Sequence, residues 1–117
     1  MNNDVLDTLR LELRRGCLII AVLAQLREEH YGYVLRKALS EQGLDIDENT
    51  LYPLLRRLES QGLLESTWRE ANKRNKRYYH LSREGEAILT QLLQEWKAID
   101  DSLNRIIGGD LLSNVAD

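Results

Sequence analysis

The sequence contains few of the residues that cross-link small domains. Of 117 residues one is a cysteine, Cys17, and two are histidines, His30 and His80. A lone cysteine cannot form a disulfide within one chain, and these three residues are too few for a zinc cage. We expect no metal and no cofactor. The fold must then depend on an apolar core, and a chain of this length can supply one for a single domain.

Long apolar runs and catalytic groupings are also missing. The chain opens with Met1-Asn-Asn-Asp rather than with the basic start of a secretory signal, and no apolar run reaches the roughly 18 residues that span a membrane. No Ser/His/Asp or paired-carboxylate grouping is visible. We therefore expect a cytoplasmic protein that has no membrane partner and is not an enzyme.

Positive charge is scarce overall but concentrated in the middle of the chain. The net charge is -3, yet residues 50–83 hold 8 basic and 3 acidic side chains, against 6 and 9 in residues 1–49 and 2 and 7 in residues 84–117. Because salt screens surface charges beyond about 8 to 10 Å, a DNA backbone on the middle segment responds to that segment rather than to the total. The net charge therefore does not exclude nucleic acid.

The segment from Asn49 to Leu64 predicts a short amphipathic helix followed by a strand. Pro53 fits only near a helix start, which places that start between Asp47 and Thr50, and Gly62 is suited to end the helix. Its expected core face consists of Leu51, Leu54, Leu55 and Leu58. Its polar face, which we expect to meet DNA, consists of Thr50, Tyr52, Arg56 and Arg57. Taken alone, the segment fits an ordinary surface helix equally well.

The neighbouring segments complete a recognisable pattern. Residues Tyr31 to Gly43 predict a preceding helix, and Leu44 to Asp47 a short turn, so that the pair reads as a helix-turn-helix. Apolar and polar residues alternate from Leu64 to Arg69 and from Tyr78 to Leu81, which predicts a hairpin with its tip in residues 70–77. This arrangement is a winged helix. The basic tip fits phosphate contact, or an ordinary solvated loop.

The two ends of the chain predict long helices with uncovered apolar faces. At the N-terminus one row runs through Leu6, Leu9, Leu13 and Cys17, and Gly16 indicates either close backbone approach or a break. Ser82 is a plausible N-cap for a last helix that ends at Gly108-Gly109. Its seam, with coiled-coil spacing, consists of Leu89, Leu92, Trp96, Ile99, Leu103 and Ile106.

The last helix has more apolar surface than one small head can cover. Burying six such side chains is worth about 9 to 18 kcal/mol gross. The simplest cover is a second copy, which predicts a homodimer. The residues expected at its interface are Leu6, Leu9, Leu89, Ile99, Leu103 and Ile106.

We therefore expect an α+β fold, mainly α with a small β-hairpin: a winged helix-turn-helix with a long C-terminal dimerisation helix. The expected parts are an N-terminal helix shared between core and dimer interface (1–28), a DNA-binding head (29–81), the C-terminal dimerisation helix (82–107) and a frayed tail (108–117).

With these motifs in place, nearly the whole chain resembles the PadR family of bacterial transcriptional regulators. The resemblance is carried by Tyr31-Gly-Tyr, by Thr50-Leu-Tyr-Pro-Leu-Leu-Arg-Arg-Leu-Glu-Ser-Gln-Gly-Leu and by Arg77-Tyr-Tyr-His-Leu-Ser-Arg-Glu-Gly. The single C-terminal helix is similar to the short PadR subfamily, which includes a multidrug-responsive repressor whose paired tryptophans sandwich flat aromatic compounds. Two departures, Asn49 where glycine is common and a wing without Gly or Pro, leave the helix start and the wing shape open.

The resemblance implies two sets of site residues. Contacts to double-stranded operator DNA are implied for Tyr31, Thr50, Tyr52, Arg56, Lys73, Arg74 and Lys76, and Arg57 joins them from the helical pattern. A ligand space between subunits is implied for Leu13, Cys17, Leu92, Leu93, Trp96 and Asp100.

The functional expectation is a dimeric, sequence-specific regulator of transcription, a repressor released by a small aromatic or phenolic effector. Two residues keep alternative interpretations. Trp96 fits simple packing in the seam as well as a ligand site, and Cys17 fits a buried small thiol better than a redox switch. The alternative function is a winged-helix adaptor for proteins that does not bind DNA.

Overall fold

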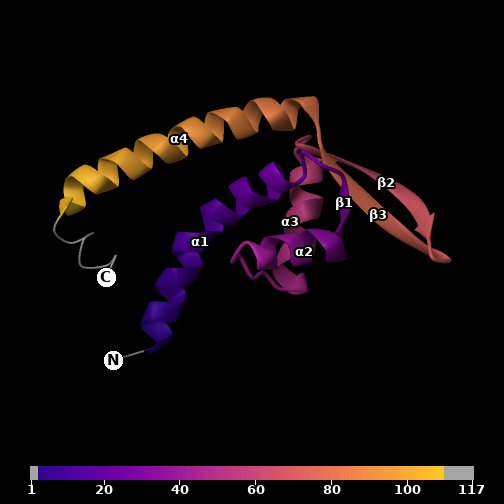
Figure 1. Cartoon of the computed structure of the whole chain (residues 1–117), viewed down its shortest axis with the longest axis horizontal. Helices are drawn as coiled ribbons and strands as arrows, with labels where there is room; N and C mark the ends of the chain where they lie inside the picture. Colours follow the sequence, from indigo (N-terminus) through magenta and orange to yellow (C-terminus); the bar gives the residue numbers. More distant parts are fainter. Residues whose placement is uncertain (1–2, 110–117) are drawn as a thin grey trace.

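The computed structural model describes residues 3–109, which form four helices and one three-stranded antiparallel sheet (Figure 1). The tail expected in residues 110–117 lies outside them. The elements are α1 (Asn3–Gln25), β1 (His30–Tyr31), α2 (Gly32–Glu41), α3 (Glu48–Ser60), β2 (Leu64–Ala71), β3 (Arg74–Leu81) and α4 (Arg83–Ile107). The expected α+β winged helix-turn-helix is confirmed. From the head formed by α2, α3 and the sheet, α1 and α4 extend to the same side (Figure 1).

The head closes around the leucine face of α3. Leu51, Leu55 and Leu58 are buried as the spacing predicted, while Leu54 is half-buried. They pack into one core with buried side chains from every other helix and from the sheet, including Val22, Leu23, Leu26, Leu35, Leu39, Leu64, Tyr79, Leu81 and Leu89. The core therefore uses the last turns of α1 and the first turns of α4, so both long helices are anchored in the head.

Helix α3 begins and ends where its sequence indicates. The Asp47 side chain accepts a hydrogen bond from the Thr50 backbone N–H at 2.8 Å, which makes Asp47 the N-cap. The helix start left open by Asn49 is thus fixed by the preceding aspartate. At the other end Gly62 has a φ of +83°, the left-handed conformation that stops a helix.

The hairpin differs from its expected form. Strands β2 and β3 pair from Leu64↔Leu81 to Ala71↔Arg74, so the tip consists of Asn72 and Lys73 alone, and the loop predicted over residues 70–77 was too long. Both residues have positive φ, 55° and 67°, as in the tight turn that matches strand twist. Asn72 thus adopts the positive φ that a glycine would otherwise supply in this turn. Strand β1 was not predicted, because two residues carry no periodicity.

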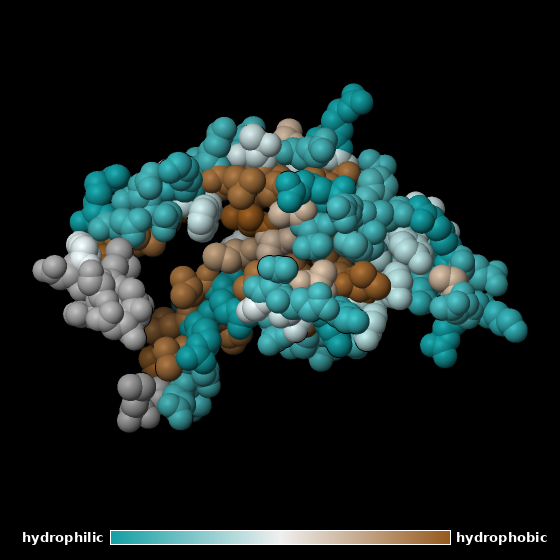
Figure 2. All heavy atoms as spheres, in the orientation of Figure 1, coloured by the Kyte–Doolittle hydropathy of each residue, from teal (hydrophilic) through white to brown (hydrophobic). Residues whose placement is uncertain are grey.

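The long helices leave apolar side chains uncovered in the single chain. Leu6, Leu9 and Leu13 of α1 are exposed, as are Ile99, Leu103 and Ile106 of α4, with Ile106 at 79%. Figure 2 shows apolar atoms along the sides of these helices that face each other. Helix α1 is unbroken at Gly16, and nothing lies within 4 Å of a Cβ placed there, so neither a break nor close approach occurs within this chain. In residues 3–109 no helix is apolar over enough of its length to cross a membrane.

The start of α4 is held against the end of α3 by hydrogen bonds of Ser82. Buried Ser82 caps α4 by accepting a hydrogen bond from the Gly85 N–H at 2.9 Å, and its hydroxyl donates to the Gly62 carbonyl at 2.7 Å. The Ser82 N–H also donates to the Leu63 carbonyl at 3.0 Å. Gly85 lies so close that an added Cβ would be 2.1 Å from that Leu63 oxygen and 2.6 Å from Leu81 Cδ1. Only glycine fits there without moving backbone.

This crowding predicts that Gly85→Ala destabilises the fold. Alanine gains about 1 kcal/mol of helix propensity, but overpacking against a backbone carbonyl costs typically about 1 to 3 kcal/mol or more. We expect a net loss in the free energy of unfolding, measured by urea denaturation followed by circular dichroism. The control is Thr90→Ala on the exposed side of α4, expected to stay within about 0.5 kcal/mol. A Gly85→Ala variant as stable as the parent contradicts the packing described.

Candidate nucleic-acid interface

The polar side of α3 is divided between two grooves. Tyr52 and Arg56, one turn apart, line a groove of about 300 Å³ between α3 and the β2–β3 hairpin. Thr50 and Arg57, two turns apart, line another of about 450 Å³ on the side of α1, with Leu11. The sequence pattern predicted that these four residues form one polar face of the helix. The structure brings only Tyr52 and Arg56 together with the hairpin, because Thr50 and Arg57 lie on the other flank.

The groove between α3 and the hairpin, called here the wing groove, is lined by aromatic and cationic side chains. These are Tyr31, Tyr33, Tyr52, Trp68 and Tyr79 with Arg56, Lys76 and Arg77, beside Gly32. Two of the predicted DNA contacts meet in it directly, because Lys76 Nζ lies 4.1 Å from the centre of the Tyr31 ring. Tyr31 also packs edge-on against Tyr78, with ring centres 5.3 Å apart. Three expected contacts, Tyr31, Tyr52 and Lys76, are therefore held at one place with Arg56.

The close packing of Tyr52 depends on glycine at the start of α2. A Cβ on Gly32 would lie 2.2 Å from Tyr52 Cε1. Gly32 is itself buried, while Tyr52 is half-buried. The Tyr-Gly-Tyr motif thus has a physical reason: its glycine makes room for the tyrosine of the recognition helix.

An ion pair fixes the hairpin against α3. Arg77 Nη2 on β3 donates to Glu59 Oε1 on α3 at 2.6 Å, and Arg77 Nε donates to Ser66 Oγ at 3.0 Å. The Ser66 hydroxyl donates in turn to Glu59 Oε2 at 2.5 Å. Beneath this network, burial raises the pKa of Tyr79, although the nearby Arg77 charge opposes the shift. The Tyr79 phenol is therefore neutral at physiological pH. In the network above it, the Arg77 and Ser66 donors and the Glu59 carboxylate all have hydrogen-bond partners.

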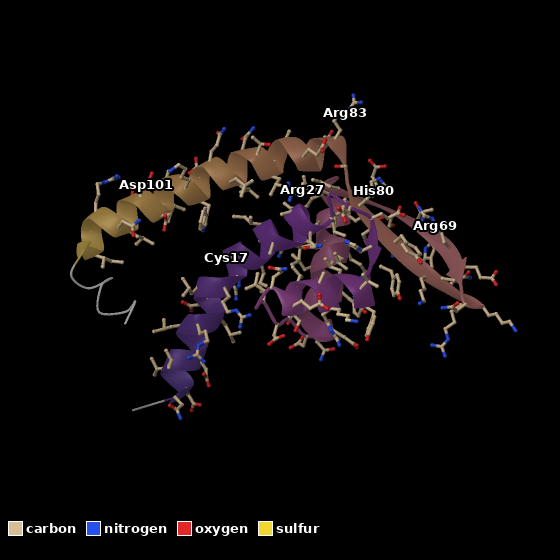
Figure 3. The ribbon with its side chains drawn as sticks, in the orientation of Figure 1. Cys17, Arg27, Arg69, His80, Arg83 and Asp101 are labelled. Atoms are coloured by element: carbon tan, nitrogen blue, oxygen red, sulfur yellow. The ribbon has the colours of Figure 1, made fainter. Side chains whose placement is uncertain are left out.

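The positive charge available for DNA is smaller than the count for residues 50–83 suggests. Arg69 is paired with Glu29 at 2.6 Å, and Arg77 with Glu59. Arg69 and His80 both lie on the hairpin (Figure 3). Within residues 3–109 no carboxylate pairs with the five cations proposed from sequence, Arg56, Arg57, Lys73, Arg74 and Lys76. Lys73 and Arg74 are exposed at the hairpin end, away from both grooves.

The expected ligand residues come together in part. Cys17, Leu93 and Trp96 line an apolar groove of about 260 Å³ between α1 and α4, together with Ile20 and Ala21, which the sequence did not indicate. Leu13, Leu92 and Asp100 are not in its lining. Cys17 is exposed in the single chain (Figure 3), so a buried thiol stays a prediction that depends on a second copy covering this groove. Trp96 is 49% exposed and is therefore not packed away within the subunit.

The residues expected at the dimer interface fall into an exposed group and one buried residue. Leu6, Leu9, Ile99, Leu103 and Ile106 are exposed, whereas Leu89 is only 5% exposed and belongs to the core of its own chain. Little of Leu89 is left for a partner, because the seam passes into the head at its first turns. In the described part of the chain no cluster of His, Cys, Asp or Glu is arranged to hold a metal ion.

Three aromatic residues of the wing groove were not predicted from the sequence as site residues: Tyr33, Trp68 and Tyr79. Trp68 is a large apolar side chain of the hairpin that is 63% exposed, Tyr33 is exposed at the start of α2, and Tyr79 is buried. Strand alternation placed Trp68 on the same face as Leu64 and Ser66, but only the tertiary structure shows that this face borders α3.

Comparison with known proteins agrees with this architecture. The sequence profile described as the Transcriptional regulator PadR-like family matches residues 19–91. A transcriptional regulator of Mycobacterium tuberculosis is 32% identical over 99 residues, covering 84% of this chain and 90% of that protein. The crystal structure of a PadR family transcriptional regulator from Eggerthella lenta is similar, with 44% identity, a TM-score of 0.84, and 90% of this chain and 94% of that chain covered.

A second solved structure, a PadR-like transcriptional regulator from Bacillus cereus, matches with 29% identity and a TM-score of 0.74, covering 84% of this chain and 98% of that chain. These relatives are regulators of transcription and not enzymes, in agreement with the sequence expectation. The family profile, which matches residues 19–91, covers the helix-turn-helix, the hairpin and the start of α4. The chain therefore belongs to the PadR-like family of transcriptional regulators.

Proposed function

We propose that this regulator binds operator DNA as a homodimer, with α3 in the major groove and the hairpin against the adjacent backbone, and that it acts as a repressor released by a small aromatic ligand. The observation that carries the proposal is the wing groove. There Tyr52 and Arg56 of α3 meet Tyr31 and Lys76, and neither Arg56 nor Lys76 has a carboxylate partner within residues 3–109, whereas Arg77 in the same groove is paired with Glu59. Unpaired cations next to an exposed helix face favour phosphate and base contacts.

The two kinds of cation have different tasks in this proposal. Arg56 projects from the middle of α3, where a guanidinium can donate two hydrogen bonds to the edge of a guanine. Lys73 is at the hairpin tip and can reach only the backbone, which carries no sequence information.

This division predicts different consequences for two substitutions. Arg56→Ala should cost about 1 to 3 kcal/mol on the operator and relax specificity at one position, because a base contact is lost. Lys73→Ala should weaken operator and random DNA alike and lower the slope of log K against log salt by about one unit. Both are measured by fluorescence anisotropy with labelled duplexes over a salt series.

Lys97→Ala on α4 is the matched control, because this lysine lies outside both grooves and pairs with Asp101 at 3.8 Å. It should bind as the parent does. If the parent shows no salt-dependent binding to promoter fragments, the protein-adaptor function takes the place of the DNA-binding one.

Dimerisation is proposed from the apolar faces of α1 and α4. Each helix is anchored in the head at one end and carries exposed leucine and isoleucine side chains toward the other. A second copy can cover these faces, and a two-fold axis then places two α3 helices for half-sites about one helical turn, 34 to 36 Å, apart.

A charge in the seam should separate the subunits. Leu103→Glu places a carboxylate where the partner helix is expected, and burying an unpaired charge is strongly unfavourable. We expect the parent to sediment as a dimer at micromolar concentration and Leu103→Glu as a monomer that keeps its helical circular dichroism. Gln94→Glu adds the same charge on the other side of α4 and should remain dimeric. A monomeric parent contradicts the proposal.

Ligand control is proposed for the groove lined by Cys17, Ile20, Ala21, Leu93 and Trp96. Its walls are apolar and belong to α1 and α4, the two helices that would connect the heads in the proposed dimer. A flat aromatic molecule against the Trp96 indole would gain stacking and cation–π contacts. Occupation would alter how α1 and α4 pack, and with them the distance between the recognition helices.

This site predicts binding that requires Trp96. In a Trp68→Phe background Trp96 is the only tryptophan, and an acridine dye or a simple phenolic acid should quench its fluorescence saturably. Trp96→Ala, followed by dye anisotropy, should lose at least about tenfold in affinity, about 1.4 kcal/mol. Leu13→Ala, outside the groove lining, is the control. Equal affinity of the Trp96→Ala variant would assign Trp96 to packing alone.

A further inference from the structure

Trp68 is a large apolar side chain that the head leaves in solvent. It lies in the middle of β2 and is 63% exposed, so it contributes little to the core. Tryptophan is enriched where proteins bind partners, because it combines a large flat apolar surface with one hydrogen-bond donor. Within residues 3–109 its indole N–H has no hydrogen-bond acceptor. Both features of this side chain are therefore available to a partner.

The position of Trp68 indicates which partner that is. In the strand register Trp68 is opposite Arg77, and it shares its face of β2 with Leu64 and Ser66, the face that contacts α3. Its indole lines the wing groove together with Tyr52 and Arg56. Trp68 therefore faces the same space as the recognition helix, whereas its neighbour Thr67 is on the opposite face of the strand.

The indole is also held in place from one side. The Arg77 guanidinium lies 5.6 Å from the centre of the Trp68 ring and 5.4 Å from that of Tyr79. Glu59 and Ser66 fix that guanidinium through hydrogen bonds of 2.6 and 3.0 Å. Because the Arg77 guanidinium already restricts the Trp68 side chain, Trp68 loses less rotamer freedom on binding, which favours affinity. The same network links the orientation of Trp68 to α3.

We propose that Trp68 is a DNA-contact residue whose indole packs on a deoxyribose and whose Nε1–H donates to a backbone phosphate, with Arg77 as its positioning residue. The inference rests on the proposed DNA binding and adds a contact that is not electrostatic. The wing groove suits a sugar–phosphate strand: Lys76 offsets the phosphate charge, while Trp68 and Tyr52 offer flat apolar surface to the sugar. Such a contact is independent of sequence.

The test uses the full-length chain with two labelled probes, a fragment from upstream of its own gene and a random duplex of equal length. Trp68→Ala should weaken binding to both by about fivefold or more, about 1 kcal/mol. Because no charge is removed, the salt slope should stay as in the parent, unlike that of Lys73→Ala. Thr67→Ala is the matched control on the other face of β2 and should bind normally. Thermal unfolding by circular dichroism checks that each variant is folded.

Fluorescence gives a second measurement that needs no change at Trp68. In Trp96→Phe the only tryptophan is Trp68, and its emission should change saturably when either duplex is added, at the same midpoint as the anisotropy. Unchanged emission together with normal binding by Trp68→Ala overturns the inference but leaves the proposed function intact. A parent chain that binds neither duplex at low salt overturns both.

Discussion

The burial of the leucine face of α3 is the constraint on which the rest of the head depends. Leu51, Leu55 and Leu58 are removed from water by side chains from every other element of the head. Because one stripe of this helix is fixed inward, Tyr52 and Arg56 must face the hairpin and Thr50 and Arg57 must face α1. A rotation of α3 by one residue would place leucines in solvent, at about 1.5 to 3 kcal/mol for each side chain. The placement of the polar side chains of α3 is thus determined by the core behind them.

Charge in this head is used for two separate purposes. Arg69 and Arg77 form ion pairs that connect the hairpin to the segment before β1 and to α3, while Arg56, Arg57 and the hairpin-tip cations have no carboxylate partner in residues 3–109. The first group gives the hairpin a defined position, and the second can interact with an external polyanion. Because the unpaired group belongs to one segment of the chain, residues 50–83, an acidic chain can still present a local positive field.

Much of this architecture was predictable from sequence because it follows from strong local signals. Leucine spacing, Pro53 near the helix start, Gly62 and the alternation after it identified the helix-turn-helix and the hairpin. The division of the α3 polar face, the role of Arg77 and the exposure of Trp68 and Cys17 were not predictable, because each depends on which element lies opposite. Strand β1 was missed for a related reason: its two residues are a strand only because β3 offers them hydrogen-bond partners.

The contact between Gly32 and Tyr52 has a consequence for how such sequences can diverge. The Tyr52 ring occupies the volume that any side chain at position 32 would need. A larger residue can enter position 32 only if the Tyr52 ring moves or is lost, so the two sites are coupled although 20 positions separate them in the chain. The position of the Tyr52 ring therefore depends on the absence of a side chain in another helix.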